Sequence, residues 1–286
     1  MADWKESNTH IRILRDAEAG KYGVLAVIAY NIEQVHGFIK AAEVARSPLI
    51  LQFFPWVVAT FDGTLVRAAA EAAKRASVPI SIHLDHAQSE ELIARAAGLP
   101  FNSIMVDMSH HEKEENLRKT TQWVRHCNER HIATEAEPGR IEGGEDGVMD
   151  TAGLEAAMTT PEEVDEFVAT GVDTLAPSFG NIHGEYGPQG PQLDFQRFNN
   201  VRQQVNKRVR LAVHGTNGFE PALVQKCIAA GCSKVNVNKL VLDDYYEHLH
   251  ANAGKIPHTQ LIEEGIKKVV DLTVKWMEIC GSAGKA

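Results

Sequence analysis

Long hydrophobic runs, paired cysteines and an excess of positive charge are all missing from this sequence. No stretch approaches the roughly 20 apolar residues of a membrane-spanning helix, and residues 1–23 lack the apolar core of a signal peptide. The four cysteines form no CxxC pair, so we expect them to be reduced thiols (Cys127, Cys227, Cys232 and Cys280). These absences predict a soluble, cytoplasmic protein without a membrane partner.

The charge balance narrows the choice of partners. A net charge of −9 argues against a nucleic-acid-binding protein, which would need a basic face. An anionic substrate would need local positive charge or helix N-termini at its site. Because 44% of the 286 residues are hydrophobic and 23% are charged, the chain can bury a large core.

Short apolar segments rich in β-branched residues alternate with longer amphipathic segments. The expected strands cover residues 24–31, 49–54, 79–85, 103–108, 132–137, 174–180, 210–215 and 234–239. The expected helices lie near residues 33–46, 62–77, 89–97, 112–130, 161–170, 194–207, 219–230, 240–252 and 259–280. Eight such repeats predict an α/β fold, a single-domain (β/α)8 TIM barrel. It would span residues 1–286, with an N-terminal helix and a C-terminal helical extension.

Several helix starts and two loops carry local signals. Asp62, Ser89 and Thr160 stand where they could cap the helices that follow them. Residues 138–153 and 180–191 are too rich in glycine and polar residues for regular elements, and each segment follows an expected strand. Long loops within a compact domain are usually functional, so both are expected at the active face of the barrel.

Residues able to do chemistry stand at the ends of nearly all the expected strands. The C-terminal ends of barrel strands meet at one mouth, where barrel enzymes carry their active sites. In the strand 79–85, alternation would turn His83 and Asp85 inward and leave His86 just past the strand end. The strand-end residues are Asn31, Asp85, His86, Asp107, Glu137, His183, His214 and Asn236.

Three of these residues, His86, His183 and His214, suit an open zinc site that leaves one position for substrate or water. His83 is expected either to contact a metal ligand without binding the metal itself or to pack in the core. His110 and His111 are loop residues without an assigned role. The other histidines are expected on the surface or on helices (His10, His36, His126, His131, His248, His250 and His258).

More than one role is open for the acidic residues Asp85, Glu145 and Asp146. Asp85 could be a general acid–base or could orient a metal ligand. It could also cap the next helix, although Ser89 is better placed to do so. Glu145 and Asp146 could form a mobile acid–base pair or an exposed acidic turn.

Several motifs occur in a recognisable order along nearly the whole chain. They are Ala29-Tyr30-Asn31, HLDHA (83–87), SIMVDMSHHEKEEN (103–116), EAEPGRIEGGEDG (135–147), GNIHGEYG (180–187), HGTNG (214–218), KVNVN (234–238) and GSAGKA (281–286). Together they resemble the class II, zinc-dependent fructose- and tagatose-bisphosphate aldolases. The resemblance implies a catalytic Zn²⁺, a monovalent cation as a further cofactor, a phosphorylated sugar as substrate, and a homodimer or homotetramer.

The resemblance also implies a role for each site residue. Asp85 would exchange the hydroxyl proton at the cleaved bond, Glu145 would exchange the proton on the carbanion carbon, and Asn236 would hold the enediolate. Residues His83 and Asp107 would support the metal site. The implied metal ligands are His86, His183, His214 and Glu137, and the implied substrate contacts are Asn31, Gly184, Gly215, Asn217, Asn236, Asn238 and Lys239.

Aldol chemistry agrees with these residues. Cleavage leaves a carbanion next to a carbonyl, and the electron sink is either a Lewis-acid metal or a lysine Schiff base. The only lysine at an expected strand end is Lys239, which favours the metal.

Four positions depart from the family pattern around the donor's phosphate. Phe54 and Asn217 stand where the family has serine, Gly187 where it has lysine, and Lys239 where it has threonine. Whether the substrate is fructose 1,6-bisphosphate therefore stays open.

Two further functions were weighed. A metal-dependent barrel hydrolase commonly opens with a His-x-His pair, which residues 24–31 lack. A catalytically silent paralogue would have no need of Asp85 and Glu145. The C-terminal helix with Trp276 and Met277 could pack on a partner subunit or close the barrel.

Overall fold

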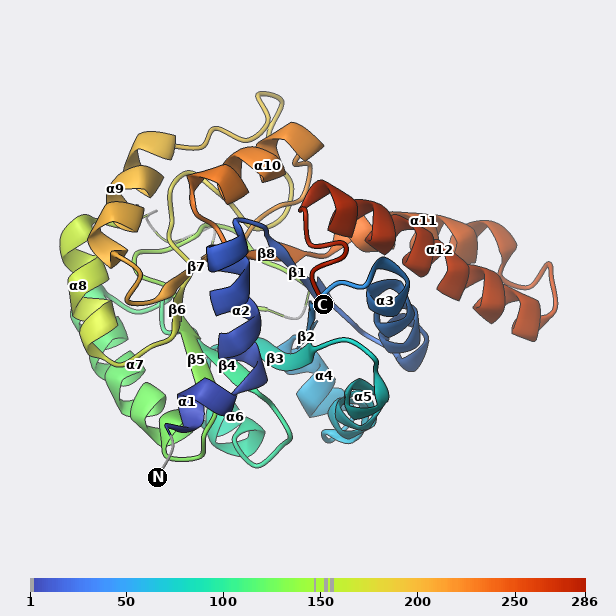
Figure 1. Ribbon diagram of the computed structural model, residues 1–286, viewed down its shortest axis with the longest axis horizontal. Helices are drawn as coiled ribbons and strands as arrows, with labels where there is room; N and C mark the ends of the chain where they lie inside the picture. Colours follow the sequence, from blue (N-terminus) through green and yellow to red (C-terminus); the bar gives the residue numbers. More distant parts are fainter. Residues whose placement is uncertain (1–2, 147, 152–153, 155–156) are drawn as a thin grey trace.

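The strands form a closed parallel barrel in the computed structural model, which describes residues 3–146, 148–151, 154 and 157–286. Each strand pairs with its neighbours in sequence, and β1 pairs with β8 to close the ring (Figure 1). The (β/α)8 barrel predicted from the sequence is therefore confirmed. The strands are β1 (Val24–Ile28), β2 (Leu49–Phe53), β3 (Ile80–Ala87), β4 (Ser103–Val106), β5 (Ala133–Ala136), β6 (Thr174–Leu175), β7 (Arg210–Val213) and β8 (Lys234–Val237).

Most strands end earlier than the sequence suggested, because side chains take over the backbone hydrogen bonds near the barrel mouth. Strand β6 was expected to run to residue 180, but its ladder stops at Leu175. Beyond it, the backbone N–H of Ser178 donates to Thr159 Oγ1 at 2.8 Å, and that of Phe179 donates to Asn181 Oδ1 at 2.9 Å. The loop that follows therefore leaves the strand ladder and passes over the mouth of the barrel.

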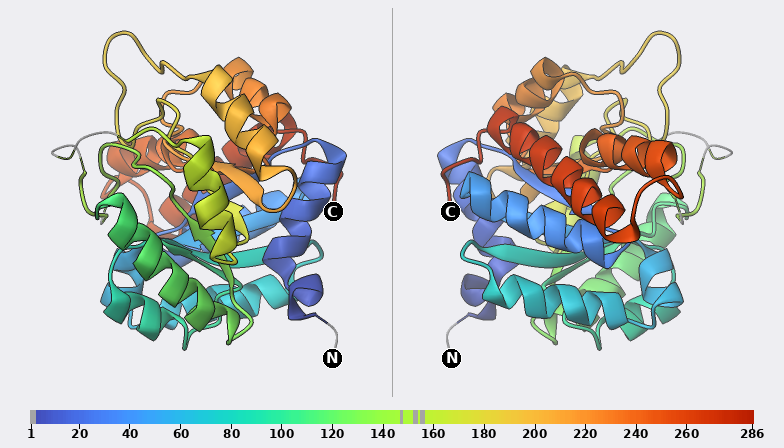
Figure 2. Two further views of the ribbon diagram at one scale, coloured as in Figure 1. Left: turned by 90° about the vertical axis from the view of Figure 1, so that its left-hand side faces the viewer. Right: turned by 90° about the vertical axis from the view of Figure 1, so that its right-hand side faces the viewer.

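The helices surround the barrel (Figure 2). One of them, α4, was not expected, because its sequence PWVVAT extends the apolar run of β2 without a polar capping residue. The helices are α1 (Trp4–Ser7), α2 (Thr9–Gly20), α3 (Ile32–Ala45), α4 (Pro55–Thr60), α5 (Thr64–Arg75), α6 (Glu90–Ala96), α7 (Lys113–Asn128), α8 (Pro161–Ala169), α9 (Phe195–Val205), α10 (Pro221–Ala230), α11 (Lys239–Asn252) and α12 (His258–Ile279).

Two of the three expected helix caps form. Ser89 accepts from the N–H of Leu92 at the start of α6, and Thr160 forms a reciprocal capping box with Glu163 at the start of α8. The prediction for Asp62 is wrong. Gly63, with φ +73°, is the N-cap residue of α5, while Asp62 forms an ion pair with Arg95.

Helix α2 closes the N-terminal end of the barrel. Its apolar side packs on the inward residues Val24, Ala26 and Ile50 of β1 and β2. His10 of the same helix is 1% exposed, and its Nδ1 lies 2.9 Å from Ser81 Oγ inside the barrel. His10 therefore lies on a helix, one of the two placements expected, and its side chain is part of the plug at this end of the barrel.

The C-terminal helix α12 packs on α11 and on α3 (Figures 1 and 2). Trp276 and Met277 of α12 are buried within this chain's own core. They therefore close the barrel side, as one of the two alternatives predicted. Among the described residues, no helix is both long and apolar enough to cross a membrane.

Candidate metal centre

A β-bulge in β3 turns His86 into the barrel mouth. Between Leu84 and Ala87, β3 uses one residue more than its partner β4. His86 takes φ +47°, a left-handed conformation that costs a non-glycine residue on the order of 1 kcal/mol. The extra residue lets Asp85 and His86 both face the site, whereas strict alternation would separate them. The prediction that β3 ends before His86 is wrong for this reason.

Two imidazoles from different strands meet at the mouth with nitrogen facing nitrogen. His86 Nε2 lies 3.2 Å from Nδ1 of His214, which directly follows β7. The second nitrogen of each ring is already paired with a carboxylate. His86 Nδ1 lies 2.8 Å from Asp107 Oδ2, and His214 Nε2 lies 2.8 Å from Glu135 Oε1.

The third imidazole and a carboxylate complete the group. The His183 ring, from the loop after β6, lies 4.7 Å from the His86 ring and almost perpendicular to it. Among the described residues, neither nitrogen of His183 has a hydrogen-bond partner, and neither does Glu137 Oε2. One ligand atom from each of His86, Glu137, His183 and His214 falls within 4.8 Å of the others. The structure thus brings together all four metal ligands expected from the sequence.

These residues fit a divalent metal ion. Buried lone pairs without donors are costly, and here they converge on one point. Three imidazoles and a carboxylate form a donor set that zinc and similar ions accept. A cation among them would use each free lone pair.

The pKa values of the grouped residues indicate the same need for positive charge. Burial, with Asp107 nearby, raises the pKa of Glu137 to about 8, and burial lowers that of His214 to about 4. Burial would lower the pKa of His86, but the carboxylates of Asp85 and Asp107 raise it to about 10. The carboxylates that hold a proton on His86 would equally stabilise a cation beside it.

A buried ion pair beneath His214 was missed by the sequence analysis. Lys234 Nζ lies 2.8 Å from Glu135 Oε2, and both side chains are fully buried. Burial would raise the pKa of Glu135, but Lys234 and the hydrogen bond with His214 hold it well below its usual value. The available signal was the alternation of polar residues in β5 and β8, the same pattern that was used for β3.

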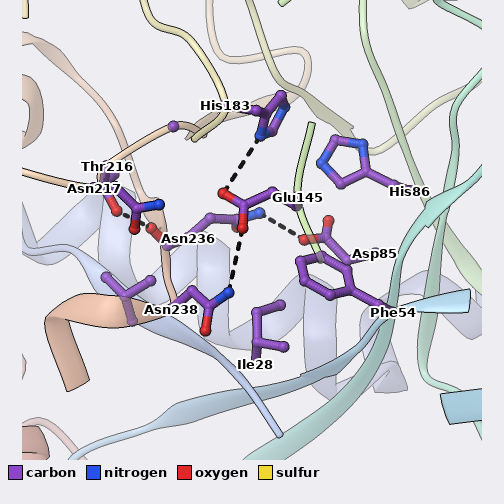
Figure 3. Close-up of a pocket in the computed structure, with 12 residues that line it drawn as sticks. Ile28, Phe54, Asp85, His86, Glu145, His183, Thr216, Asn217, Asn236 and Asn238 are labelled. Carbon is purple, nitrogen blue, oxygen red and sulfur yellow. Dashed lines mark hydrogen bonds and ion pairs between the residues drawn. The ribbon is translucent and has the colours of Figure 1, made fainter. Parts of the chain in front are cut away.

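A pocket of about 280 Å³ opens beside the histidines (Figure 3). Lys234 is not among the side chains that line it, so the Schiff-base alternative gains no support. The lining residues are Ile28, Phe54, Asp85, His86, Glu145, His183, Gly215, Thr216, Asn217, Asn236, Val237 and Asn238.

Asp85 presents a carboxylate to this pocket. Its Oδ2 accepts from Asn236 Nδ2 at 3.0 Å and from Gln52 Nε2 at 3.2 Å, and Oδ1 has no hydrogen-bond partner in the described part of the chain. Burial would raise the pKa of Asp85, but His86, the His83 imidazole 3.8 Å from Oδ1 and the charge of Lys234 hold it well below its usual range. An ionised carboxylate at the pocket can take up a proton from a bound hydroxyl.

Glu145 reaches into the pocket from the loop after β5 (Figure 3). Its Oε1 lies 3.8 Å from His183 Nδ1, and its Oε2 accepts from Asn238 Nδ2 at 3.2 Å. The two predicted loops lie together here, because the N–H of His183 donates to the carbonyl of Glu142 at 2.7 Å. Residue 147 of the matching motif, and residues 152 and 153 of this loop, lie outside the described residues.

The expected substrate contacts separate into two groups. Gly215, Asn217, Asn236 and Asn238 line the pocket. Glycine is required at Gly215, because a Cβ there would lie 2.1 Å from the carbonyl oxygen of Ile182, and φ is +68°.

The other expected contacts are engaged elsewhere in this structure. Asn31 caps α3 and donates to the hydroxyl of Tyr245 at 3.0 Å. Lys239 is half-exposed and forms an ion pair with Glu185. Gly184 takes φ +83° in the loop after β6, outside the lining of the pocket.

A (β/α)8 barrel with three imidazoles and a carboxylate grouped at its mouth, next to two further carboxylates, belongs to the class of metal-dependent barrel enzymes. The family model described as class-II fructose-bisphosphate aldolase matches residues 8–285. The chain therefore belongs to this family of metal-dependent aldolases, which are carbon–carbon lyases and act on phosphorylated sugars. Membership also disfavours the hydrolase alternative.

Three relatives illustrate the match. A crystal structure of a provisionally named fructose-1,6-bisphosphate aldolase from Coccidioides immitis superposes with a TM-score of 0.96 at 50% identity, over 98% of both chains. The YdjI aldolase of Escherichia coli K12 has a TM-score of 0.85 at 31% identity, over 97% of this chain and 98% of that one. The fructose-bisphosphate aldolase of Geobacillus stearothermophilus is 32% identical over 96% of each chain.

Proposed function

We propose that this protein is a zinc-dependent aldolase that reversibly cleaves a ketose bisphosphate, with fructose 1,6-bisphosphate as the first candidate. The products would be dihydroxyacetone phosphate and an aldehyde. The observation that supports this best is the convergence of His86, His183, His214 and Glu137 beside Asp85 and Glu145. We further propose a monovalent cation at the substrate, a homodimer or homotetramer, and a cytoplasmic location.

The residues divide the chemistry of the cleavage among them. When bound, the divalent ion supplies Lewis acidity beside the substrate carbonyl. Asp85 takes the proton from the hydroxyl at the breaking bond, which drives carbonyl formation on the leaving aldehyde. Asn236 holds the remaining oxygens, and Glu145 then supplies a proton to the carbanion carbon. Gly215 and its neighbours offer backbone N–H groups to a phosphate.

Steady-state cleavage by the zinc-loaded protein tests the proposal. Fructose 1,6-bisphosphate, tagatose 1,6-bisphosphate and unphosphorylated ketoses are compared, each with and without a chelator. We expect chelator-sensitive turnover of a bisphosphate that returns when zinc is restored. Chelator-resistant turnover would contradict the metal assignment, and turnover of unphosphorylated ketoses alone would contradict the bisphosphate.

Glu145→Gln is expected to lower kcat by roughly 10²–10⁴-fold, because the amide cannot transfer the carbanion proton. Zinc content should stay at the wild-type level, since Glu145 is not one of the four grouped ligands. The measurement is kcat together with exchange of a substrate carbon-bound proton with deuterated solvent. The neighbouring exposed residue gives the matched control Asp146→Asn, which should retain the wild-type kcat and the wild-type rate of proton exchange. Equal losses in the two variants would show a loop effect rather than proton transfer.

A changed donor specificity is the second candidate, and the lining of the pocket favours it. Phe54 forms part of the wall and packs edge to face on Tyr30, with 65° between the ring planes, and neither lysine nor arginine is among the described residues that line the pocket. Lys239, which was expected to contact the substrate, is paired with Glu185. A donor phosphate would therefore depend on backbone N–H groups and on asparagine amides.

The double substitution Phe54→Ser with Asn217→Ser is expected to raise kcat/KM for fructose 1,6-bisphosphate, on the order of tenfold for one or two added hydrogen bonds. The two hydroxyls would replace an apolar ring and an amide in the wall of the pocket. The control is kcat/KM for an unphosphorylated ketose, which should not improve. No gain with the bisphosphate would count against a rebuilt phosphate site.

A further inference from the structure

We propose that Glu135 and Lys234 are positioning residues that determine which nitrogen of His214 is offered to the metal ion. The proposal rests on the proposed metal site. It adds the two residues that select the tautomer of one of the three imidazoles. Neither the fold nor the set of ligands specifies that tautomer.

The geometry around His214 leads to this assignment. Its Nε2 lies 2.8 Å from Glu135 Oε1, and its Nδ1 faces His86 Nε2 at 3.2 Å. An ionised carboxylate can only accept a hydrogen bond, so the single proton of neutral His214 must lie on Nε2. The lone pair on Nδ1 is then directed at the space shared with His86.

A second contact of His214 Nε2, with Asn236, does not change this assignment of the proton. The amide nitrogen of Asn236 also lies 3.1 Å from His214 Nε2. That nitrogen is a donor with two hydrogens, and one of them has a carboxylate acceptor in Asp85 Oδ2 at 3.0 Å. Charge-assisted hydrogen bonds are the stronger ones, so both Nε2 and the amide direct their hydrogens at carboxylates.

Lys234 keeps Glu135 ionised and oriented. Its Nζ lies 3.1 Å from Oε1 and 2.8 Å from Oε2 of Glu135, so it binds both oxygens. Because β5 and β8 are not neighbours in the ring, this ion pair bridges the interior of the barrel beneath the metal site. A fully buried carboxylate would be strongly destabilising without such a counter-charge.

His86 has a different arrangement, which makes His214 the informative ligand. The carboxylate that holds His86, Asp107, accepts from the N–H and the hydroxyl of Ser109 at 3.1 and 2.7 Å. These are neutral groups that stay in place whatever the carboxylate does. Only the carboxylate behind His214 is bound to a buried ammonium, so substitution there can redirect the hydrogen bond.

Glu135→Gln should reverse the direction of that hydrogen bond. The amide has only one accepting oxygen, and the Lys234 ammonium will take it. The amide NH₂ group then faces His214 Nε2, which must accept, and the proton moves to Nδ1, the nitrogen needed for the metal. We expect zinc affinity, measured by competition with a chromogenic chelator, to fall about 10–100-fold, the usual cost of losing such a ligand partner.

The double variant Glu135→Gln with Lys234→Met should recover most of that affinity. Methionine has similar length but no donor, so the amide can rotate and accept from His214 Nε2 again. A pair that only stabilises the barrel would give another result: the melting temperature of the metal-free protein would change, and zinc affinity would not follow the rescue. Asp173→Asn is the matched control, since Asp173 also forms a carboxylate–lysine pair, with Lys5, but just before β6 at the other end of the barrel; its zinc affinity should not change.

Nitrogen NMR of the zinc-loaded wild-type protein tests the tautomer directly, even if Glu135→Gln does not fold. The signals of His214, assigned by their loss in His214→Ala, should show the proton on Nε2. A proton on Nδ1 would overturn the inference, as would a Glu135→Gln variant that binds zinc normally or a double variant that shows no rescue. Failure of the wild-type protein to bind one zinc per chain would instead overturn the proposed function.

Discussion

Replacing His214 with alanine is expected to abolish metal-dependent turnover while the protein stays folded. The substitution removes one of three imidazoles at the barrel mouth and leaves the Glu135–Lys234 ion pair in place beneath it. Loss of Lewis-acid stabilisation is worth several kcal/mol, so kcat/KM should fall by about 10³-fold or more. The measurement combines kcat/KM, zinc content of the purified protein and the circular dichroism spectrum.

The matched control is His36→Ala on the exposed side of α3, which should keep wild-type zinc content and activity. A His214→Ala protein that still binds one zinc per chain and turns over normally would contradict the metal assignment. If activity is lost because the protein has unfolded, the spectrum will show it.

Asp85→Asn is expected to lower kcat by about 10²–10⁴-fold with zinc still bound, because an amide cannot take the hydroxyl proton. Asparagine has nearly the same shape, and its oxygen can still accept from Asn236 and Gln52. The loss should therefore appear mainly in kcat rather than in KM.

The exposed ion-paired aspartate of the α4–α5 turn supplies the control, Asp62→Asn, which should be as active as the wild type. If Asp85→Asn loses zinc in proportion to activity, Asp85 acts by orienting the adjacent ligand and not by proton transfer. The ratio of activity to zinc content therefore distinguishes these two roles.

The sequence was sufficient for the barrel and for the residues at its mouth. Alternation of strands and helices predicts the ring, and polar residues at strand ends mark the mouth because those ends converge in any such barrel. The three histidines, Glu137 and Asp85 could be found in this way, whereas Glu145 lies in a loop and its role came only from the resemblance to the aldolase family.

Residues within strands and backbone irregularities were harder to predict. A single polar residue inside a strand, such as Glu135 or Lys234, has no obvious partner until β5 and β8 are placed in three dimensions. The bulge at His86 depends on a register shift between two strands, which no local propensity encodes. The helical position of His10 could be expected, but its contact with Ser81 could not, because the two residues are far apart in sequence.

The closure of the ring by β1 and β8 has a consequence for the order of events during synthesis. The strand that carries Lys234 pairs with β1 only after more than 200 intervening residues have left the ribosome. The proposed metal ligands come from β3, from the residue after β5, and from the segments after β6 and β7. A nascent chain therefore lacks the complete set until the segment after β7 has been made, and contacts this distant in sequence are among the last to form. We therefore expect each molecule to bind its metal ion late. The ion that it binds would depend on which ions are available once translation has ended.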